Sequence, residues 1–446
     1  MMTLDDKKEA LLTLSQQVLE EARRQGATSA AVGVSSGEGL SVDVRMAEID
    51  KLEYHRDQGL GVTVYVGQRQ GMSSTGDLSE AAIRDAVRAA CDIAKYTSED
   101  DCCGLADAEL MATEFPDLDL YHPWDITAEQ AIDQAIACEN SAREFDSRIS
   151  NSDGASVSTY SNLRAYANSH GFAAVSTGSS HSLSCSVIAH EADGEGMQRD
   201  HWYSSSRVAE HLESPESVGQ RAAKETLSRL GAHKLTSRQS PVLYIPRLAS
   251  GLLGHFTSAI SGSAQYRKAS YLLDSVGHQV FPEFVHLYEQ PLIPRGAHSA
   301  PYDSEGVATR AQDFVKDGIV QSYTMGSYSA RKLGLQSTGN AGGLHNLTID
   351  STGQDFAAML KLMDTGLLLT GLIGSGVNNM TGDYSRGATG FWVERGEIQY
   401  PVEEITIAGN LKQMLAGIVA VGNDWDPRIA TRTGSILVEQ MMISGE

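Results

Sequence analysis

The chain has 446 residues, 41% of them apolar, and its 35 basic and 57 acidic residues give a formal net charge of −22. A chain of this length exceeds what one core organises, so roughly two or three domains are expected. The acidic balance disfavours a nucleic-acid partner, because binding to phosphate backbones depends on clustered Lys and Arg.

The expected location is the cytoplasm, with no membrane partner. The N-terminus MMTLDDKKEALL lacks the basic start and apolar run of a signal peptide, and no stretch approaches the about 18 apolar residues of a membrane span. Five cysteines at irregular spacing argue against a disulfide framework and for a reducing compartment.

The N-terminal half predicts an α+β domain. Leu4 to Gln25 has the apolar periodicity of a helix, and residues 30–66 predict a three-stranded meander with turns near Gly37 and Gly59. Residues 149–200 are rich in small polar side chains and predict several short antiparallel strands.

Helix starts are predicted by capping signals, in which a Ser, Thr or Asp precedes an acidic or amide residue by three positions. Such pairs are Asp77 with Glu80, Thr127 with Gln130, and Ser351 with Gln354. Ser214 before Pro215 predicts a further start, since proline is well accommodated at the first helical position.

The main domain boundary is predicted at Pro241, where a fresh strand from Val242 to Ile245 begins. This gives an N-terminal α+β domain, residues 1–240, and a C-terminal β-rich domain, residues 241–446. In the second domain Leu248 to Ile260 predicts a helix, and the apolar run Leu367 to Ile373 predicts a strand buried on both faces.

The glycine-rich stretch after Gly374 predicts a hairpin that turns at Arg395 and Gly396. Pro401 is expected to interrupt its second strand, and Asn410 to cap a following helix. The segment GDYSRG, residues 382–387, is interpreted as a loop that the hairpin presents. A nucleotide-binding role is disfavoured, because no GxxxxGK[ST] occurs and the segment precedes a strand rather than a helix.

No self-sufficient active site can be found from residue chemistry. No HExxH, HExxxH or GxSxG motif is present. His255 lies within a predicted helix but is followed by Phe256, Thr257 and Ser258, none of which can act as the carboxylate base for a metal-activated water. An unconventional metal site remains an alternative if the fold gathers His181, His190 and His345.

Long strings of the sequence resemble the PmbA (TldE) branch of the TldD/PmbA family. They include YRKASYLLDSVG, PYDSEGV, SYSARKLGLQSTGNAGG and GDYSRGATGFWVERGEIQYPVEEITIAGNL in the second half, and LGVTVYVGQRQG, IAKYTSEDD and FPDLDLYHP in the first. The resemblance implies an N-terminal α+β domain and a C-terminal antiparallel, barrel-like domain with a few helices. It also implies dimerisation around a cavity that admits extended chains.

The activity that the resemblance implies is proteolysis by a zinc peptidase that pairs a TldD-type with a PmbA-type subunit, matures microcin-type peptides and degrades unfolded antitoxin. The TldD branch ligates metal through an HExxxH helix and a later cysteine. Here the corresponding helix, Leu252 to Ile260, keeps only His255, and the cysteine position falls about Thr433. The chain is therefore expected to be catalytically inactive alone, without a metal of its own, and zinc is expected in a TldD-like partner.

Two sets of residues are candidates for contacts. His255, Tyr266 and Arg267 are expected to line a pseudo-active-site cleft. Asp383, Tyr384 and Arg386 are expected to contact a peptide or the partner subunit. The alternative function is a homodimeric, non-catalytic peptide-binding protein.

Overall fold

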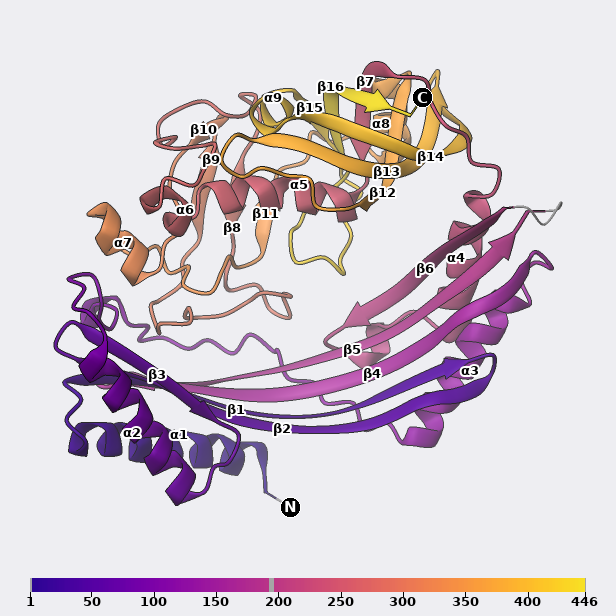
Figure 1. Ribbon diagram of the computed structural model, residues 1–446. Coiled ribbons are helices and arrows are strands. Elements are labelled where there is room, and N and C mark those ends of the chain that lie inside the picture. The colour runs from indigo at the N-terminus through magenta and orange to yellow at the C-terminus, as the bar shows by residue number, and fades with distance from the viewer. Residues whose placement is uncertain (1, 192–195, 446) are drawn as a thin grey trace.

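The computed structural model describes residues 2–191 and 196–445. It consists of a long, curved antiparallel sheet and a second domain that lies over the concave side of that sheet (Figure 1). Among the residues described, no helix combines the length and apolarity needed to cross a membrane.

The N-terminal sheet has the strand order β3-β2-β1-β4-β5-β6, and every neighbouring pair is antiparallel. Its strands are β1 (Ser29–Arg45), β2 (Glu48–Val66), β3 (Arg69–Thr75), β4 (Ile149–Asn168), β5 (Ala173–His190) and β6 (Met197–Ser206). The helices are α1 (Leu4–Arg24), α2 (Glu80–Tyr96), α3 (Ala128–Arg143) and α4 (Pro215–Ser228), with short 3-10 turns η1 (Ala108–Leu110) and η2 (Ala209–His211).

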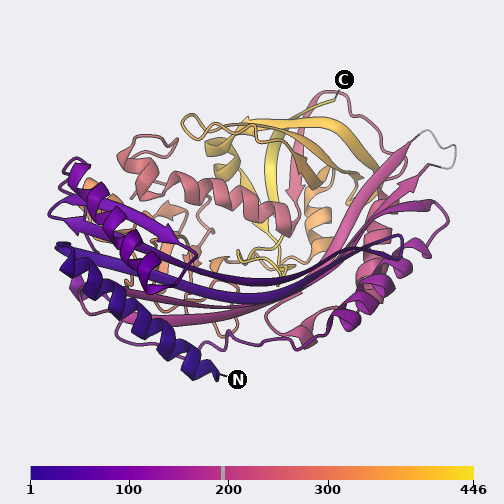
Figure 2. The ribbon, with the colours of Figure 1, turned by 60° about the horizontal axis from the view of Figure 1, so that its bottom comes forward.

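The two faces of this sheet differ because side chains alternate along each strand. One face carries apolar residues such as Val32, Val42 and Leu183, which are buried beneath helices. Figure 2 shows the helices at the two ends of this convex face, with strands between them. The alternate positions on the concave face of β1 and β5 are mostly Gly and Ser, whereas β4 places Tyr160, Arg164 and Tyr166 there. Ser158 and Ser182 are cross-strand partners whose hydroxyls lie 2.9 Å apart.

The strands are longer than predicted. The glycines at 37 and 59 do not turn the chain but lie within β1 and β2. Gly37 is needed because the ring of Tyr160 occupies the space that a side chain there would take. Residues 149–200 likewise form long strands rather than several short ones. The chain reverses instead at Met46 and Ala47, both left-handed, whose amides donate 2.8 and 2.7 Å bonds to the buried carboxylate of Glu139.

The C-terminal domain contains a six-stranded sheet, of which five strands close into a barrel-like ring, and several helices. The sheet runs β14-β13-β12-β7-β16-β15; an additional pairing of β14 with β16 closes the ring, and β15 pairs with β16 outside it. The strands are β7 (Arg238–Tyr244), β12 (Gly366–Ile373), β13 (Asp383–Glu394), β14 (Glu397–Asn410), β15 (Ile418–Val421) and β16 (Ile436–Ser444). A smaller sheet has the order β10-β9-β8-β11, from β8 (Leu287–Glu289), β9 (Gln312–Lys316), β10 (Ile319–Val320) and β11 (Leu347–Ile349).

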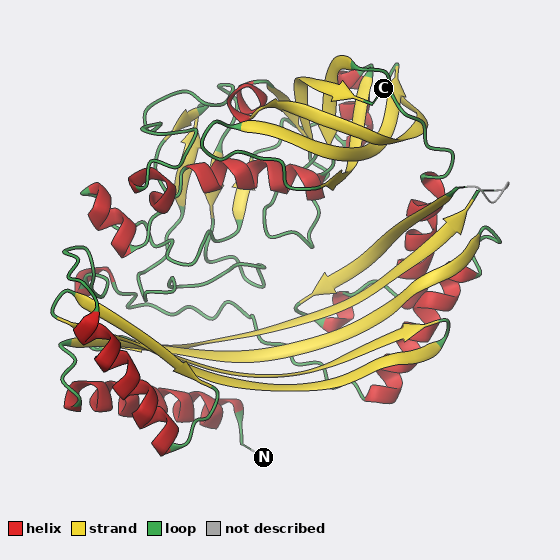
Figure 3. Cartoon of the chain, viewed as in Figure 1, coloured by secondary structure: helices red, strands yellow, loops and turns green. Residues whose placement is uncertain are grey.

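The helices of this domain are α5 (Pro246–Ala259), α6 (Gly262–Tyr266), α7 (Ser327–Leu333), α8 (Phe356–Met363) and α9 (Leu411–Ala416). Figure 3 shows α5 on the side of the barrel that faces the N-terminal sheet. It packs there because Leu252, Leu253 and Phe256 form one apolar side in the domain core.

The predicted α+β architecture with a barrel-like second domain is confirmed. The turn at Arg395 and Gly396 is also confirmed, and both residues are left-handed. The interpretation of residues 382–387 as a loop is wrong, because Asp383 to Gly387 pair with Asn410 to Thr406 as part of β13. Pro401 does not interrupt β14 either; it lies opposite Phe391 within the ladder.

Of the predicted capping boxes, only Thr127 with Gln130 forms. Helix α2 is capped by Ser79 rather than Asp77, and α8 by Asp355 rather than Ser351. Asn410 does cap α9, accepting a bond from the amide of Lys412.

The close contact between β3 and α2 can be tested by substitution of Gly71. A side chain at Gly71 would collide with the carbonyl oxygen of Ala90 and lie 2.6 Å from the nitrogen of Ala94, both fixed helix backbone. Gly71→Ala is expected to lower the free energy of unfolding by about 1–3 kcal/mol, measured by chemical denaturation. Gly61→Ala on the neighbouring strand is the matched control, since no atom lies within 4 Å there. Equal stabilities of the two variants would contradict the packing.

Candidate functional site

The first candidate site lies where α5 meets β13. The ring of His255 packs edge-on against Tyr384, with ring centroids 5.8 Å apart and an interplanar angle of 78°. Tyr384 and Arg386 project from the same face of β13, because they are two positions apart on a strand. The structure thus brings His255, Tyr384 and Arg386 together, although the sequence assigned them to two separate sets.

The electrostatics of this group keep the imidazole uncharged near neutral pH. Burial lowers the pKa of His255 below its ordinary value of 6.5, and the positive charge of Arg386 lowers it further. Burial raises the pKa of Tyr384, with contacts to Tyr244 and Arg386 acting in the opposite sense. The Nε atom of Arg386 is buried and has no hydrogen-bond partner among the described residues.

These residues do not fit a zinc ion. His255 is a single imidazole, and the guanidinium beside it would repel a dication. Thr433, at the position that the resemblance assigns to a ligand cysteine, is buried and donates its hydroxyl proton to the carbonyl of Gly434 at 2.9 Å. Within residues 2–191 and 196–445, no three His, Cys, Asp or Glu side chains are grouped as a metal site.

Tyr266, Arg267 and Asp383 make their contacts away from this group. The ring of Tyr266 packs against Tyr328 of α7 with centroids 5.8 Å apart, and Arg267 lies over Tyr266 at 5.9 Å. The exposed carboxylate of Asp383 accepts bonds from Thr381 and Asn410. The contact roles assigned to all six residues stay predictions.

The metal site considered from His181, His190 and His345 does not assemble. His181 is buried in the N-terminal domain, where its ring nitrogens lie 2.9 Å from the hydroxyl of Thr159 and 2.8 Å from the carbonyl of His122. His345 belongs to the other domain and faces a different set of partners.

The second candidate site is a cavity of about 890 Å³ between the two domains. Strands β1 to β4 supply one wall, in which small residues such as Gly33, Gly59 and Gly61 keep the concave face open. Residues 298–304 and 341–345 supply the other wall, which includes His298, Tyr302 and His345.

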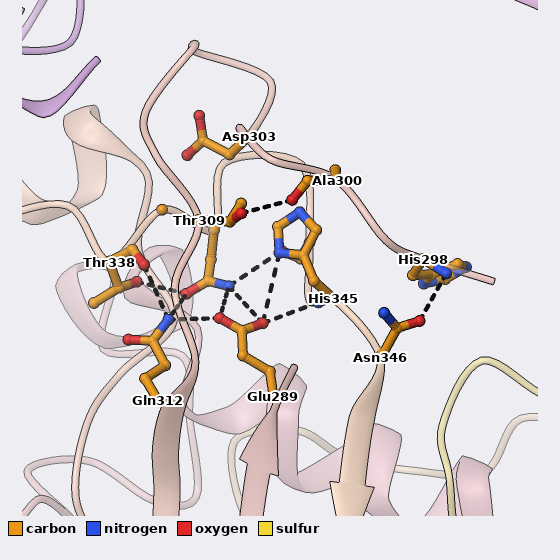
Figure 4. Close-up of polar contacts among 12 residues, drawn as sticks. Glu289, His298, Ala300, Asp303, Thr309, Gln312, Thr338, His345 and Asn346 are labelled. Carbon is orange, nitrogen blue, oxygen red and sulfur yellow. Dashed lines mark hydrogen bonds and ion pairs between the residues drawn. The ribbon is translucent and has the colours of Figure 1, made fainter. Parts of the chain in front are cut away.

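A buried carboxylate organises the C-terminal wall of this cavity (Figure 4). Glu289 is fully buried and accepts hydrogen bonds from Nε2 of Gln312 at 2.5 Å, from Nδ2 of Asn340 at 2.9 Å and from the amide of His345 at 2.9 Å. The Nδ1 atom of His345 lies 3.6 Å from Oε2 of Glu289, outside hydrogen-bond distance, and has no hydrogen-bond partner in the described part of the chain.

Asp303 joins the two loops that border the cavity. Its carboxylate accepts bonds from the amides of Glu305 and Val307 on one side and of Ala341 on the other. Burial raises the pKa of Asp303 to about 6, against the effect of these bonds. The side chain therefore gains its charge only as the pH rises through about 6.

Sequence reasoning missed this cavity, since Glu289, Asp303 and Gln312 carry no recognisable spacing. Glu289 lies alone at the end of a three-residue strand. The signal that could have found the wall is the density of glycine and small polar residues in GLQSTGNAGG, which is typical of a loop that must pass close to other backbone.

Comparison with known proteins identifies the class. The models for domain 1, the central domain and the C-terminal domain of PmbA/TldA metallopeptidases match residues 30–94, 121–230 and 237–445. The Haemophilus influenzae metalloprotease PmbA homolog is 49% identical over 429 residues, covering 96% of this chain and 94% of that protein. Metalloprotease PmbA of Escherichia coli O157:H7 is 48% identical over 417 residues, covering 94% and 92%.

Solved structures show the same fold. A Bacteroides thetaiotaomicron protein described as a candidate modulator of DNA gyrase superposes with a TM-score of 0.92 at 28% identity, covering 100% of both chains. TldE from Thermococcus kodakarensis superposes with a TM-score of 0.84 at 20% identity, covering 97% of this chain and 100% of that one. The chain belongs to the PmbA (TldE) branch of the TldD/PmbA metalloprotease family.

The charge of Arg386 gives a prediction for His255. Arg386→Gln removes the positive charge that disfavours the imidazolium, so the pKa of His255 is expected to move upward toward its ordinary value. NMR titration of the imidazole signals measures the shift. Arg267→Gln is the control, because Arg267 lies over Tyr266 and should leave the titration unchanged. A His255 pKa that is insensitive to Arg386 would show that the two side chains are not coupled.

The carboxylate of Glu289 gives a second prediction. Glu289→Gln places an amide group among hydrogen-bond donors, so the free energy of unfolding is expected to fall by about 2 kcal/mol or more. Glu283→Gln, at an exposed position of the same domain, should change it by less than about 0.5 kcal/mol. Denaturation curves that do not separate these two variants would contradict the network.

Proposed function

We propose that this chain is the PmbA/TldE-type, non-catalytic subunit of a cytoplasmic zinc metalloprotease that acts on unfolded peptides, including microcin-type precursors and unfolded antitoxin. A TldD-like partner supplies the zinc and cuts the peptide. This chain contributes one side of the chamber and binds no metal of its own.

The observation that carries the proposal is the positive charge of Arg386 on β13, which lies beside His255 of α5. The chain belongs to a metalloprotease family, yet α5 offers only one uncharged imidazole, next to this guanidinium. A positive charge at this place opposes a bound dication and favours an anionic or carbonyl group. The buried Nε atom of Arg386 is a donor that such a group could engage.

The concave wall supports an extended peptide as the substrate. The Gly and Ser residues of β1 and β5 on this face let the main chain of a peptide approach closely, and the serine hydroxyls offer hydrogen bonds without selecting a particular side chain. Recognition through main-chain groups suits unfolded chains of varied sequence.

The test is reconstitution with a TldD-like partner. The purified chain alone is expected to contain far less than one zinc per molecule, measured by elemental analysis, and to leave unfolded peptides intact. Mixed with the partner, it should support hydrolysis that a chelator removes and zinc restores. A partner whose HExxxH glutamate is replaced by glutamine should give a complex without activity. Stoichiometric zinc and peptide hydrolysis by the isolated chain would overturn the proposal.

The second candidate function is a homodimeric peptide-binding protein that needs no peptidase partner. The 890 Å³ cavity favours this function, because residues of this one chain line it on both sides. Co-purification from the native cell followed by mass spectrometry separates the two. Recovery of a TldD-like chain supports the protease subunit, and recovery of peptides with this chain alone supports the binding protein.

A further inference from the structure

The N-terminal wall of the 890 Å³ cavity consists of residues with little or no side chain. Two rows cross the strands of the sheet: Gly33 of β1 lies opposite Gly61 of β2, and Ser35 of β1 lies opposite Gly59 of β2. Ser74 of β3 lies opposite Gly61 and extends the first row. Because neighbouring strands lie about 4.8 Å apart, these residues form a patch about 10 Å wide across β1 to β3, the cavity floor.

The chain itself does not require the glycines of the floor. None of Gly33, Gly59 and Gly61 has a positive φ, and a side chain added at Gly33 or Gly61 would meet no atom within 4 Å. Glycine within a strand lowers stability, and it often marks a place where a ligand or another backbone approaches closely. The open space above Gly33 and Gly61 therefore points to an occupant that lies against the sheet.

An arginine without a partner borders the floor. Arg164 and Tyr166 of β4 lie opposite Ser35 and Gly33 and line the same cavity. The guanidinium of Arg164 forms no hydrogen bond or ion pair with the residues that the structure describes. In a chain of net charge −22, most arginines have carboxylates to pair with, so an unpaired one at a cavity is notable. Its planar fork can bind a carboxylate through two hydrogen bonds.

The opposite wall presents an unused hydrogen-bond acceptor. His345 is only 8% exposed, and neither ring nitrogen has a hydrogen-bond partner within residues 2–191 and 196–445. Because Nδ1 lies 3.6 Å from Oε2 of Glu289, the carboxylate favours the tautomer of the neutral imidazole that is protonated on Nδ1. Nε2 is then an acceptor, and Figure 4 shows it on the side of the ring that points away from Glu289. His345 lines the cavity, so an N–H group of a ligand can donate to Nε2 there.

These features define the ligand by its chemistry. It is flat where it covers the floor, it has a carboxylate for Arg164, and it has an N–H donor for His345. The carboxyl-terminal end of a peptide meets all three requirements, because its amide groups are planar and carry N–H donors. An extended chain advances about 3.3 Å per residue, so roughly three residues cover the floor.

We propose that this cavity binds the carboxyl-terminal end of a peptide, with the terminal carboxylate on Arg164 and the main chain over Gly33, Gly59 and Gly61. The inference rests on the proposed role with unfolded peptides and adds which end of the peptide this chain holds. The charge of the chain end fixes the direction of the peptide. The floor accepts varied sequences, since it contacts main chain rather than side chains.

Peptide binding to the isolated full-length chain tests the role of Arg164. The probe is a short peptide of alanine, serine and glycine with a fluorescent label at its amino terminus, prepared with a free carboxyl terminus or with a terminal amide. Fluorescence polarisation is expected to show that the acid binds about tenfold more tightly than the amide. Arg164→Gln should weaken binding of the acid about tenfold and remove this difference.

Arg56→Gln is the matched control, because Arg56 is an exposed arginine of β2 that does not line the cavity. It should leave both affinities unchanged. Equal binding of acid and amide to the unmodified chain, or a difference that persists in Arg164→Gln, would overturn the proposal.

Gly61→Val tests the floor separately. The added side chain meets no neighbouring atom at its Cβ, and valine favours strands, so the unfolding temperature is expected to stay the same or to rise. The branched side chain occupies the space above the floor and should weaken binding of both peptides about tenfold. A clearly lower unfolding temperature would show that the sheet itself needs this glycine, and undiminished binding would show that no peptide lies there. Either result overturns the proposal.

Competition experiments separate a peptide end from a free carboxylate. Acetylated triglycine with a free carboxyl terminus is expected to displace the labelled peptide, whereas acetate at the same concentration should not. Equal displacement by acetate would show that the site takes a carboxylate alone and would overturn the assignment to a peptide. These assays contain neither zinc nor a partner, so their failure leaves the reconstituted hydrolysis unaffected, and a failed reconstitution leaves these binding results unaffected.

Discussion

The fold depends on the strict alternation of side chains along the strands of the N-terminal sheet. Because successive residues point to opposite faces, one strand can supply apolar side chains to the helices and small polar ones to the space beneath the second domain. Val32, Val34 and Val42 hold the convex face against the helices, whereas Gly33 and Ser35 leave the concave face open. The cavity between the domains is thus a consequence of the same pattern that builds the core.

The second domain closes this cavity with a wall whose residues are held by hydrogen bonds to a carboxylate buried beneath them. Glu289 is buried in the C-terminal domain and holds Gln312, Asn340 and the amide of His345. Because these donors converge on one buried carboxylate, the network holds their segments of the wall together. In the same domain α5 turns His255 toward Tyr384, and the nearby Arg386 sets the charge of that position. The positive charge of Arg386 would repel a dication at His255.

Helices and strands are predicted correctly from the sequence where a periodic apolar pattern is long. The prediction fails where contacts between distant segments decide the local structure. The α5 helix, β12 and the hairpin turn at Gly396 follow from local patterns. The strand breaks expected at Gly37 and Gly59 do not occur, because Gly37 makes room for the ring of Tyr160 and Gly59 pairs with Ser35 within the ladder. Pro401 stays in its strand since a register shift nearby accommodates it. The Glu289 network could not be predicted, because its members come from separate segments that only the fold brings together.

The positions of the six candidate residues also depend on contacts between distant segments, which the sequence alone does not show. Residues 382–387 look like a loop because glycine and polar residues dominate them, yet pairing with β14 makes Asp383 to Gly387 part of a strand. A strand alternates its side chains, so Asp383 points to solvent while Tyr384 and Arg386 project toward α5. Asp383 therefore belongs to the surface, whereas its sequence neighbours Tyr384 and Arg386 belong to the buried polar group with His255. His255, distant in sequence, joins the buried group because α5 packs across the strand. Because α5 carries no recognisable catalytic motif, its chemistry has to be inferred from the side chains that pack against it.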